Sequence, residues 1–88
     1  MVKWQLYFTK HAQKDAHKIA AAGLRKKVEA LLSVLEVNPY QNPPHYEKLV
    51  GELSGALSRR INMQHRQVYQ VLEKERAVKI LRMWTHYE

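Results

Sequence analysis

Three arginines lie within eight residues in the second half of the chain, at positions 59, 60 and 66. Each guanidinium offers a planar fork of donors, so two of them converging on one point suit a phosphate. Because adjacent strand residues point to opposite faces, Arg59 and Arg60 cannot both face one site, whereas Arg66 can lie beside one of them. The alternative, which spacing alone favours, is that the arginines lie along the surface or pair with carboxylates. Those carboxylates belong to Glu47, Glu52, Glu73 and Glu75.

Two further side chains could move protons. Glu47 follows a loop containing two prolines and could act as a general base, although a solvated surface carboxylate is the alternative. The side chain of a histidine in water has a pKa near ~6.5, so His86 could serve as a general acid at neutral pH. Its position near the end of the chain, taken alone, favours an exposed terminal histidine instead. Tyr87 could stack on a nucleobase.

Other kinds of site find little support. The chain has no cysteine, which excludes disulfides, thiolate zinc sites and cysteine nucleophiles. His11, His17 and His65 have no carboxylate at ligand spacing, so no metal site is predicted. The glycine-rich phosphate and dinucleotide loops and the serine-hydrolase motif are also missing from the sequence, and no cofactor is predicted.

The apolar pattern of the first half predicts a strand and two helices. Residues 2–8 alternate as a half-buried strand does, with Val2, Trp4, Leu6 and Phe8 on one face. Thr9 can cap a first helix, and Gly23 suits the left-handed residue that ends it. The apolar face of that helix consists of Ala12, Ala16, Ile19 and Ala20. A second helix carries the stripe Leu24, Val28, Leu31, Leu32 and Leu35, and Asn38 and Pro39 end it.

The second half reads as a connection followed by strands. Residues 38–56 hold all three prolines and two of the three glycines. Strands are predicted over residues 56–62, 66–72 and 77–84, with a charged turn at residues 73–76. Because the links between them are short, these three strands form an antiparallel meander.

This order of elements predicts an α+β fold, with one twisted antiparallel sheet of four to five strands and the helical hairpin packed on one face. The first strand is expected at an edge or beside the last strand. The other face is left open for polar side chains of the C-terminal strands. These are Arg59, Arg60, His65, Arg66, Arg82 and His86. Alternation through Val78, Ile80, Arg82 and Trp84 extends to His86 and predicts that it lies near the open face.

Length and charge limit the classes of function. The 88 residues are predicted to form one domain, residues 1–88. Fifteen Lys and Arg against eight Asp and Glu give a net charge of +7, which favours an anionic partner such as nucleic acid, an acidic protein or a membrane surface. Simple solubility explains the charge almost as well. No apolar run approaches the ~20 residues that span a bilayer, and the first residues do not resemble a signal peptide, so a cytoplasmic protein is predicted.

Several motifs together resemble one family. They are Leu-Ser-Gly-Ala-Leu-Ser-Arg-Arg-Ile at residues 53–61, His-Arg-Gln-Val-Tyr at residues 65–69, and His-Tyr at residues 86–87. A proline-rich segment followed by Glu47 precedes them. This combination resembles the YoeB/Txe toxins of the RelE/ParE superfamily, which belong to bacterial toxin–antitoxin operons. The resemblance covers the whole chain by length and element order and is sharp over residues 43–88. It implies a fold similar to the microbial ribonucleases.

The resemblance also implies an activity, which is metal-independent cleavage of mRNA in the ribosomal A site. It places Glu47 at the family's general base, His86 at its general acid and Arg66 at the arginine that stabilises the scissile phosphate. Arg60 matches the second phosphate arginine, with Arg59 the less certain member of its pair, and Tyr87 matches the terminal aromatic. Two departures are Glu88, which follows the terminal His-Tyr pair, and residues 82–85, which depart from the family pattern.

Two classes of function remain after the sequence is considered. The first is a ribosome-dependent endoribonuclease with an acidic antitoxin of the YefM/Axe kind, the ribosome and mRNA as partners, and a homodimer within the toxin–antitoxin complex. The second is a non-enzymatic relative that acts by protein binding, either a gyrase-inhibiting ParE-like toxin or a degenerate toxin. Gyrase-type relatives generally lack the set formed here by Glu47, Arg66 and His86, so this set distinguishes the two classes.

Overall fold

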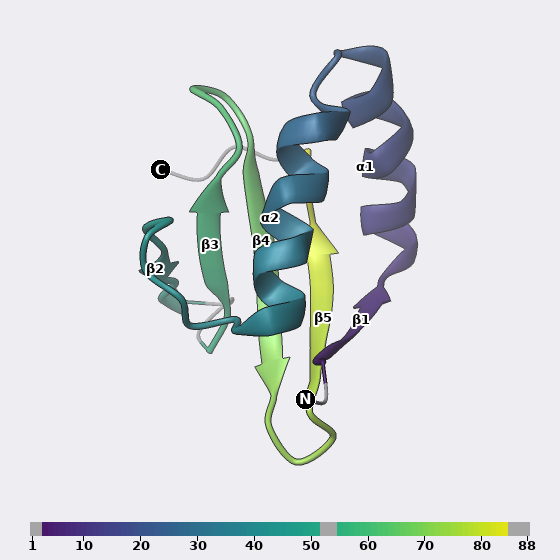
Figure 1. The fold of residues 1–88 in the computed structure, drawn as a ribbon. Coiled ribbons are helices and arrows are strands. Elements are labelled where there is room, and N and C mark those ends of the chain that lie inside the picture. Colours follow the sequence, from purple (N-terminus) through teal and green to yellow (C-terminus); the bar gives the residue numbers. More distant parts are fainter. Residues whose placement is uncertain (1–2, 52–54, 85–88) are drawn as a thin grey trace.

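The computed structural model describes residues 3–51 and 55–84 of the chain (Figure 1). One strand is followed by two helices and then by four strands. The elements are β1 (Gln5–Phe8), α1 (Lys10–Ala21), α2 (Arg25–Val37), β2 (Glu47–Lys48), β3 (Leu57–Arg60), β4 (Arg66–Leu72) and β5 (Ala77–Arg82). The predicted α+β class is confirmed. Neither described helix has the length or apolar character that crossing a membrane would require.

Local signals account for both ends of the helical hairpin. The Thr9 hydroxyl accepts a hydrogen bond from the Ala12 N–H at 3.0 Å, which satisfies one of the free donors in the first turn of α1. Gly23 has a φ of 75°, a conformation that glycine adopts without a steric penalty, and it lets the chain turn directly into α2. Asn38 ends α2, as predicted.

The sheet has the order β1-β5-β4-β3-β2. Strands β2 to β5 pair antiparallel, as the meander predicts, and β1 lies at an edge beside the last strand. The pairing of β1 with β5 is parallel, however, so the sheet is mixed and not wholly antiparallel. Strands β3 and β5 run in the same direction, because both pair antiparallel with β4, and β1 runs in that direction too.

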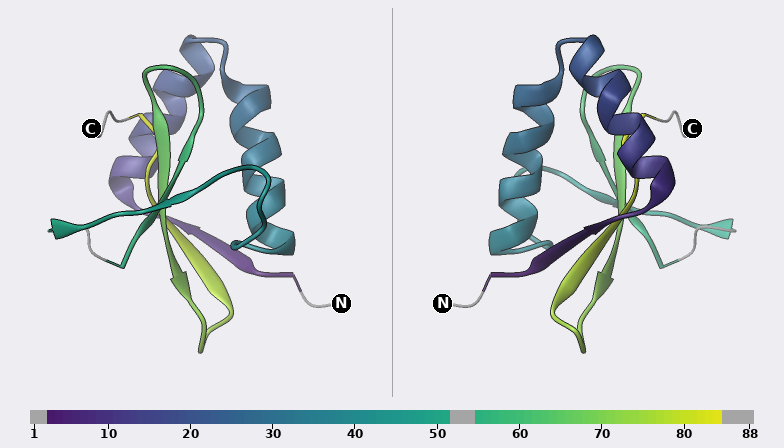
Figure 2. Two further views of the ribbon diagram at one scale, coloured as in Figure 1. Left: turned by 90° about the vertical axis from the view of Figure 1, so that its left-hand side faces the viewer. Right: turned by 90° about the vertical axis from the view of Figure 1, so that its right-hand side faces the viewer.

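The core lies between the helices and one face of the sheet (Figures 1 and 2). Ala12 and Ile19 of α1 and Val28 and Leu35 of α2 meet Leu57, Tyr69, Val78, Ile80 and Met83. The stripe predicted for α2 packs against this core, whereas in α1 the buried positions are Ala12, Asp15 and Ile19. Ala16 and Ala20 are exposed, so the predicted apolar face of α1 is only partly correct.

One irregularity changes the end of β5. Tyr69 lies opposite Ile80, but the preceding Val68 lies opposite Arg82, so Leu81 is an extra residue in β5. The predicted alternation from Val78 to Trp84 is therefore wrong beyond Ile80, because an extra residue shifts the faces of those that follow. Val78 and Ile80 belong to the helix-covered core and not to the open face.

Candidate active site

A pocket of about 390 Å³ lies on the face of the sheet opposite the helices. Its volume falls in the ~300–1,000 Å³ range of small-molecule sites. Strands β2, β3 and β4 and the loop before β2 supply its walls. The lining residues are Pro44, His45, Glu47, Ser58, Arg60 and Arg66. Among the described residues, three that the sequence singles out for chemistry thus lie in one pocket, namely Glu47, Arg60 and Arg66.

Strand register explains why these side chains meet. Arg60, the last residue of β3, lies directly opposite Arg66, the first residue of β4, and opposite residues of an antiparallel pair share a face. Glu47 lies opposite Ser58, which is two residues before Arg60 and therefore also on that face. The sheet accordingly places two guanidiniums and one carboxylate side by side, although they come from three different strands.

Glu47 and Arg66 form an ion pair. One terminal nitrogen of Arg66, Nη1, donates to Oε2 of Glu47 at 3.1 Å. The Arg66 side chain is only 18% exposed, whereas the Glu47 side chain is 52% exposed. The arginine is thus largely held by the protein, and the carboxylate remains accessible to a ligand. This arrangement suits an anion bound by fixed donors beside a base that can reach it.

Two pocket residues were not predicted from the sequence. Nε2 of His45 lies 3.8 Å from Oε1 of Glu47, which makes an ion pair when the imidazole is protonated. The hydroxyl of Ser58 is buried and has no hydrogen-bond partner among the residues that the structure describes. Strand alternation is the signal that could have found Ser58, because it stands two residues from Arg60. His45 lies in a loop, where no such periodicity applies.

Arg59 does not lie in this pocket, so the expectation that it contacts phosphate is corrected. It is 1% exposed and extends into the opposite side of the sheet, as alternation with Arg60 requires. Its Nη2 donates to the carbonyls of Pro39 at 3.1 Å and Gln41 at 2.7 Å. It therefore anchors the segment that follows α2.

The Arg59 guanidinium also lies over two aromatic rings. Its central carbon is 5.5 Å from the ring centroid of Tyr46 and 5.7 Å from that of Tyr69, within the range of cation–π attraction. Burial raises the pKa of the Tyr69 hydroxyl, and the nearby Arg59 charge opposes that effect. The Tyr69 hydroxyl donates to the Pro39 carbonyl at 3.0 Å, so arginine and tyrosine hold the same turn.

Arg82 is engaged by the first helix. Its Nε donates to Oδ2 of Asp15 in α1 at 2.8 Å, and Asp15 is 2% exposed. Burial by itself raises the pKa of Asp15, but hydrogen bonds from Arg82 and from two backbone amides outweigh it and lower the pKa below its usual value. Sequence reasoning missed Asp15, although its spacing of three and four residues from Ala12 and Ile19 places it in the buried stripe.

The remaining predicted residues lie elsewhere. His65 stacks on Trp84 with ring centroids 3.7 Å apart, so it is a packing residue in the described structure. His86 and Tyr87, the predicted general acid and terminal aromatic, lie outside the described residues. Within residues 3–51 and 55–84, no group of three or more His, Asp or Glu side chains gathers as a metal site would require.

Comparisons with known proteins give one sequence-family match and several similar structures. Residues 5–87 match the sequence family described as the YoeB-like toxin of bacterial type II toxin–antitoxin systems. The fold is similar to that of a YoeB/ParE toxin from Agrobacterium tumefaciens, with 26% identity, a TM-score of 0.85, and coverage of 94% of this chain and 99% of that one. No curated protein sequence matches this chain.

Staphylococcus aureus supplies two further similar structures, each 31% identical and covering 94% of this chain and 97% of the other. One is a YoeB–YefM complex, with a TM-score of 0.79, and the other is a YoeB dimer, with a TM-score of 0.77.

Proposed function

Because this chain belongs to the family of YoeB-like toxins of bacterial type II toxin–antitoxin systems, we propose that it is an endoribonuclease that cleaves mRNA on the ribosome and so inhibits translation. The observation that carries the proposal is the pairing of Glu47 with Arg66 beside Arg60 in one accessible pocket. Cleavage of RNA by its own 2′-hydroxyl requires a base beside cations that bind the phosphate, and these three side chains provide both.

RNA carries its own nucleophile, the 2′-hydroxyl next to the scissile phosphate. In the proposed reaction the Glu47 carboxylate takes the proton of that hydroxyl, while its oxygen forms a bond to phosphorus. The bond from phosphorus to the 5′-oxygen breaks, and the His86 imidazolium gives its proton to that oxygen. The products are a 2′,3′-cyclic phosphate and a 5′-hydroxyl. This sequence of steps needs neither a metal ion nor a cofactor.

The two pocket arginines have an electrostatic role in this mechanism. Negative charge builds on the phosphorane oxygens in the transition state, and fixed guanidiniums stabilise it there. The low exposure of Arg66 supports this assignment, because a donor already held by protein need not be reorganised during the reaction. Arg60 is the second phosphate ligand, and Tyr87 shapes the site. Acid and base contribute ~10²–10⁴-fold each, so the ribosome supplies further positioning.

The same family membership suggests partners for this chain. The two staphylococcal structures show YoeB in a complex with YefM and YoeB as a dimer. We infer that this chain binds an acidic antitoxin and forms a homodimer within that complex. Its net charge of +7 supports an acidic partner, because complementary charge speeds association and disfavours wrong partners.

A cleavage assay on programmed ribosomes tests the proposed activity. Purified protein is added to ribosomes that carry an mRNA, and primer extension maps any cut. We expect Glu47→Gln to lower the single-turnover rate by ~10²–10⁴-fold, the usual contribution of a general base. The matched control is Glu75→Gln, the same chemical change in the exposed turn between β4 and β5, which should leave the rate within about twofold, as surface changes usually do. Wild-type activity in Glu47→Gln would refute the base assignment.

A further inference from the structure

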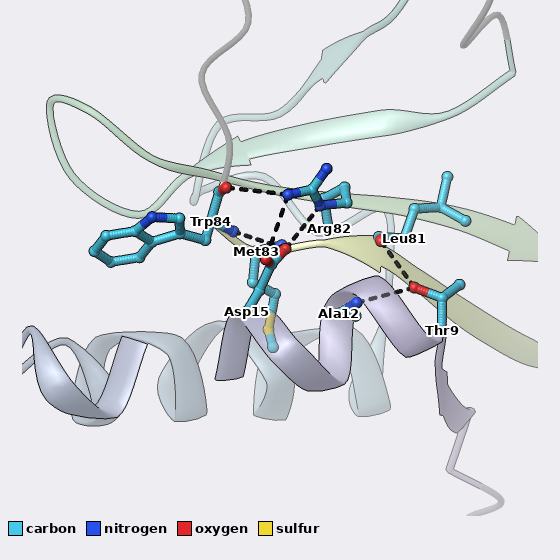
Figure 3. A network of polar contacts seen from close by, with 7 residues as sticks. All are labelled: Thr9, Ala12, Asp15, Leu81, Arg82, Met83 and Trp84. Atoms are coloured by element: carbon cyan, nitrogen blue, oxygen red, sulfur yellow. Dashed lines mark hydrogen bonds and ion pairs between the residues drawn. The ribbon is translucent and has the colours of Figure 1, made fainter. Parts of the chain in front are cut away.

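Asp15 is a buried carboxylate that the proposed chemistry does not use. It sits in the middle of α1, is 2% exposed, and accepts hydrogen bonds from three residues at the end of β5 (Figure 3). Arg82 contributes Nε at 2.8 Å and Nη2 at 3.4 Å. A buried charge is tolerated only when it is paired and hydrogen-bonded, so this position is specialised.

The other two donors are backbone groups. The amides of Met83 and Trp84 donate to Oδ2 of Asp15 at 3.0 and 3.2 Å. These are the first two residues after β5, whose ladder with β4 ends at Arg82. The Asp15 carboxylate thus accepts hydrogen bonds from backbone amides that lie just beyond the ladder between β4 and β5. Charge-assisted bonds of this kind are roughly twice as strong as neutral ones.

Two residues, Asp15 of α1 and its N-cap Thr9, together make hydrogen bonds to every residue from 81 to 84. The Thr9 hydroxyl, which caps α1, donates to the Leu81 carbonyl at 2.9 Å. The Nη2 of Arg82 bonds the Trp84 carbonyl at 3.4 Å, and the Met83 side chain is buried in the core. Figure 3 shows Thr9 and Asp15 facing this short stretch of chain, within which Arg82 also bonds Trp84. The direction in which the chain leaves the sheet is therefore set by α1.

We propose that Asp15 is a positioning residue that fixes the start of the C-terminal segment and thereby aims His86 at the substrate. The inference rests on the proposed function, in which His86 is the general acid. His86 follows Trp84 by two residues, and two residues of chain span at most ~7 Å. An anchor at Trp84 therefore restricts the volume that the imidazole can reach.

The anchor is tested without any activity, by amide hydrogen exchange. Asp15→Asn keeps the shape of the side chain but removes the charge that faces Arg82. The controls are Ile19→Val and Ile19→Ala, which change a residue in the same buried stripe of α1. One should lower the free energy of unfolding less than Asp15→Asn does, and the other more. At matched stability, we expect the Met83 and Trp84 amides to exchange at least tenfold faster in Asp15→Asn than in the Ile19 variants. Equal protection would overturn the proposal. If Asp15→Asn does not fold, Arg82→Gln serves instead, because its side chain is 34% exposed.

The consequence for His86 is tested by single-turnover cleavage on ribosomes. A misplacement of about 1 Å costs ~10²-fold, so Asp15→Asn should lower the maximal rate by that order. The ribosome concentration at half-maximal rate should change less than twofold, because binding groups are untouched. A general loss of structure would change both the maximal rate and the ribosome concentration at half-maximal rate.

A substrate with sulfur in place of the bridging 5′-oxygen identifies the step. A thiol with a pKa near ~8.5 leaves as a thiolate and needs no proton, whereas an alkoxide does. The proposal predicts that Asp15→Asn cleaves this sulfur-containing mRNA within about threefold of the wild-type rate. For each Ile19 variant, the cleavage rate divided by the wild-type rate should be the same on both substrates. A deficit of equal size on both substrates would overturn the link to His86. A wild-type protein that cuts neither mRNA would refute the proposed function, whereas the exchange measurement would still decide the anchor.

Discussion

Two adjacent arginines with opposite surroundings provide a direct test of how the structure assigns roles. Arg59 is 1% exposed and holds the turn after α2, whereas Arg60 is exposed and lines the pocket with Arg66. We predict that Arg59→Ala lowers stability and spares the chemistry of the folded protein, and that Arg60→Ala does the reverse. The two variants remove the same side chain from neighbouring positions, so each is the control for the other.

The size of the effect follows from the contacts of Arg59. Its two bonds to carbonyls, at 3.1 and 2.7 Å, are of the charged kind that contributes ~1.5–3 kcal/mol each. The two aromatic rings add a desolvated cation–π contribution of about 2 kcal/mol. Several kcal/mol of desolvation offset these gains in the native state. With the cavity that alanine would leave, the net loss is ~2–4 kcal/mol, and 2 kcal/mol lowers the Tm of a domain this small by roughly 8–16 °C.

Thermal and urea unfolding measure this loss, and single-turnover cleavage below the lower Tm measures the chemistry. Arg60→Ala should change the free energy of unfolding by about 0.5 kcal/mol or less, as exposed positions do. Its cleavage rate should fall by ~10²–10³-fold, because the substitution removes one donor to the transition state. Arg59→Met, which keeps the length of the side chain, should be more stable than Arg59→Ala.

One result would refute this reasoning. If Arg59→Ala unfolds at the wild-type temperature but fails to cleave, the buried position of Arg59 does not describe its role, and Arg59 contacts the substrate.

Three other predictions concern the pocket arginine Arg66, the stability of the protein at low pH, and binding of the antitoxin. Arg66→Ala should lower cleavage by ~10²–10³-fold with an unchanged circular dichroism spectrum; full activity would contradict the phosphate assignment. The lowered pKa of Asp15 gives stability that is present above its usual pKa of 3.8 and lost as the pH falls through the native value, so acid should destabilise Asp15→Asn less steeply than wild type. Association with an acidic antitoxin should slow as salt rises, and a salt-independent rate would argue for apolar docking.

Elements set by local signals could be predicted from the sequence. The ends of β4 match the prediction, and Thr9, Gly23 and Asn38 mark the ends of the helices as expected. Each of these features depends on residues within a few positions of one another. The resemblance groups Glu47, Arg60 and Arg66, and these three side chains do line one pocket. Short-linked strands account for Arg60 and Arg66, because the register of such strands follows from their turns. Strand β2, which carries Glu47, was not predicted, because residues 38–56 read as a connection.

Features that depend on distant residues could not be predicted. The direction in which β1 pairs with β5 is a contact over some 70 residues, and alternation carries no information about it. Alternation separates Arg59 from Arg60 but does not say which face the helices cover. The extra residue at Leu81 interrupts the two-residue alternation of β5, and the prediction for His86 assumed that this alternation continues. Asp15 looks like one more charge on a basic helix until its partners 67 to 69 residues away are seen.

The central claim is that the RNA itself supplies the nucleophile that Glu47 activates. It is tested most directly by a ribosome-bound mRNA with a single 2′-deoxynucleotide on the 5′ side of the phosphate that the protein cuts. The account predicts no cleavage of that mRNA, normal cleavage when the deoxynucleotide stands one position upstream, and a 2′,3′-cyclic phosphate on the product of the all-ribose mRNA. Cleavage at the deoxynucleotide would contradict the account, because the nucleophile would then be water or a protein group.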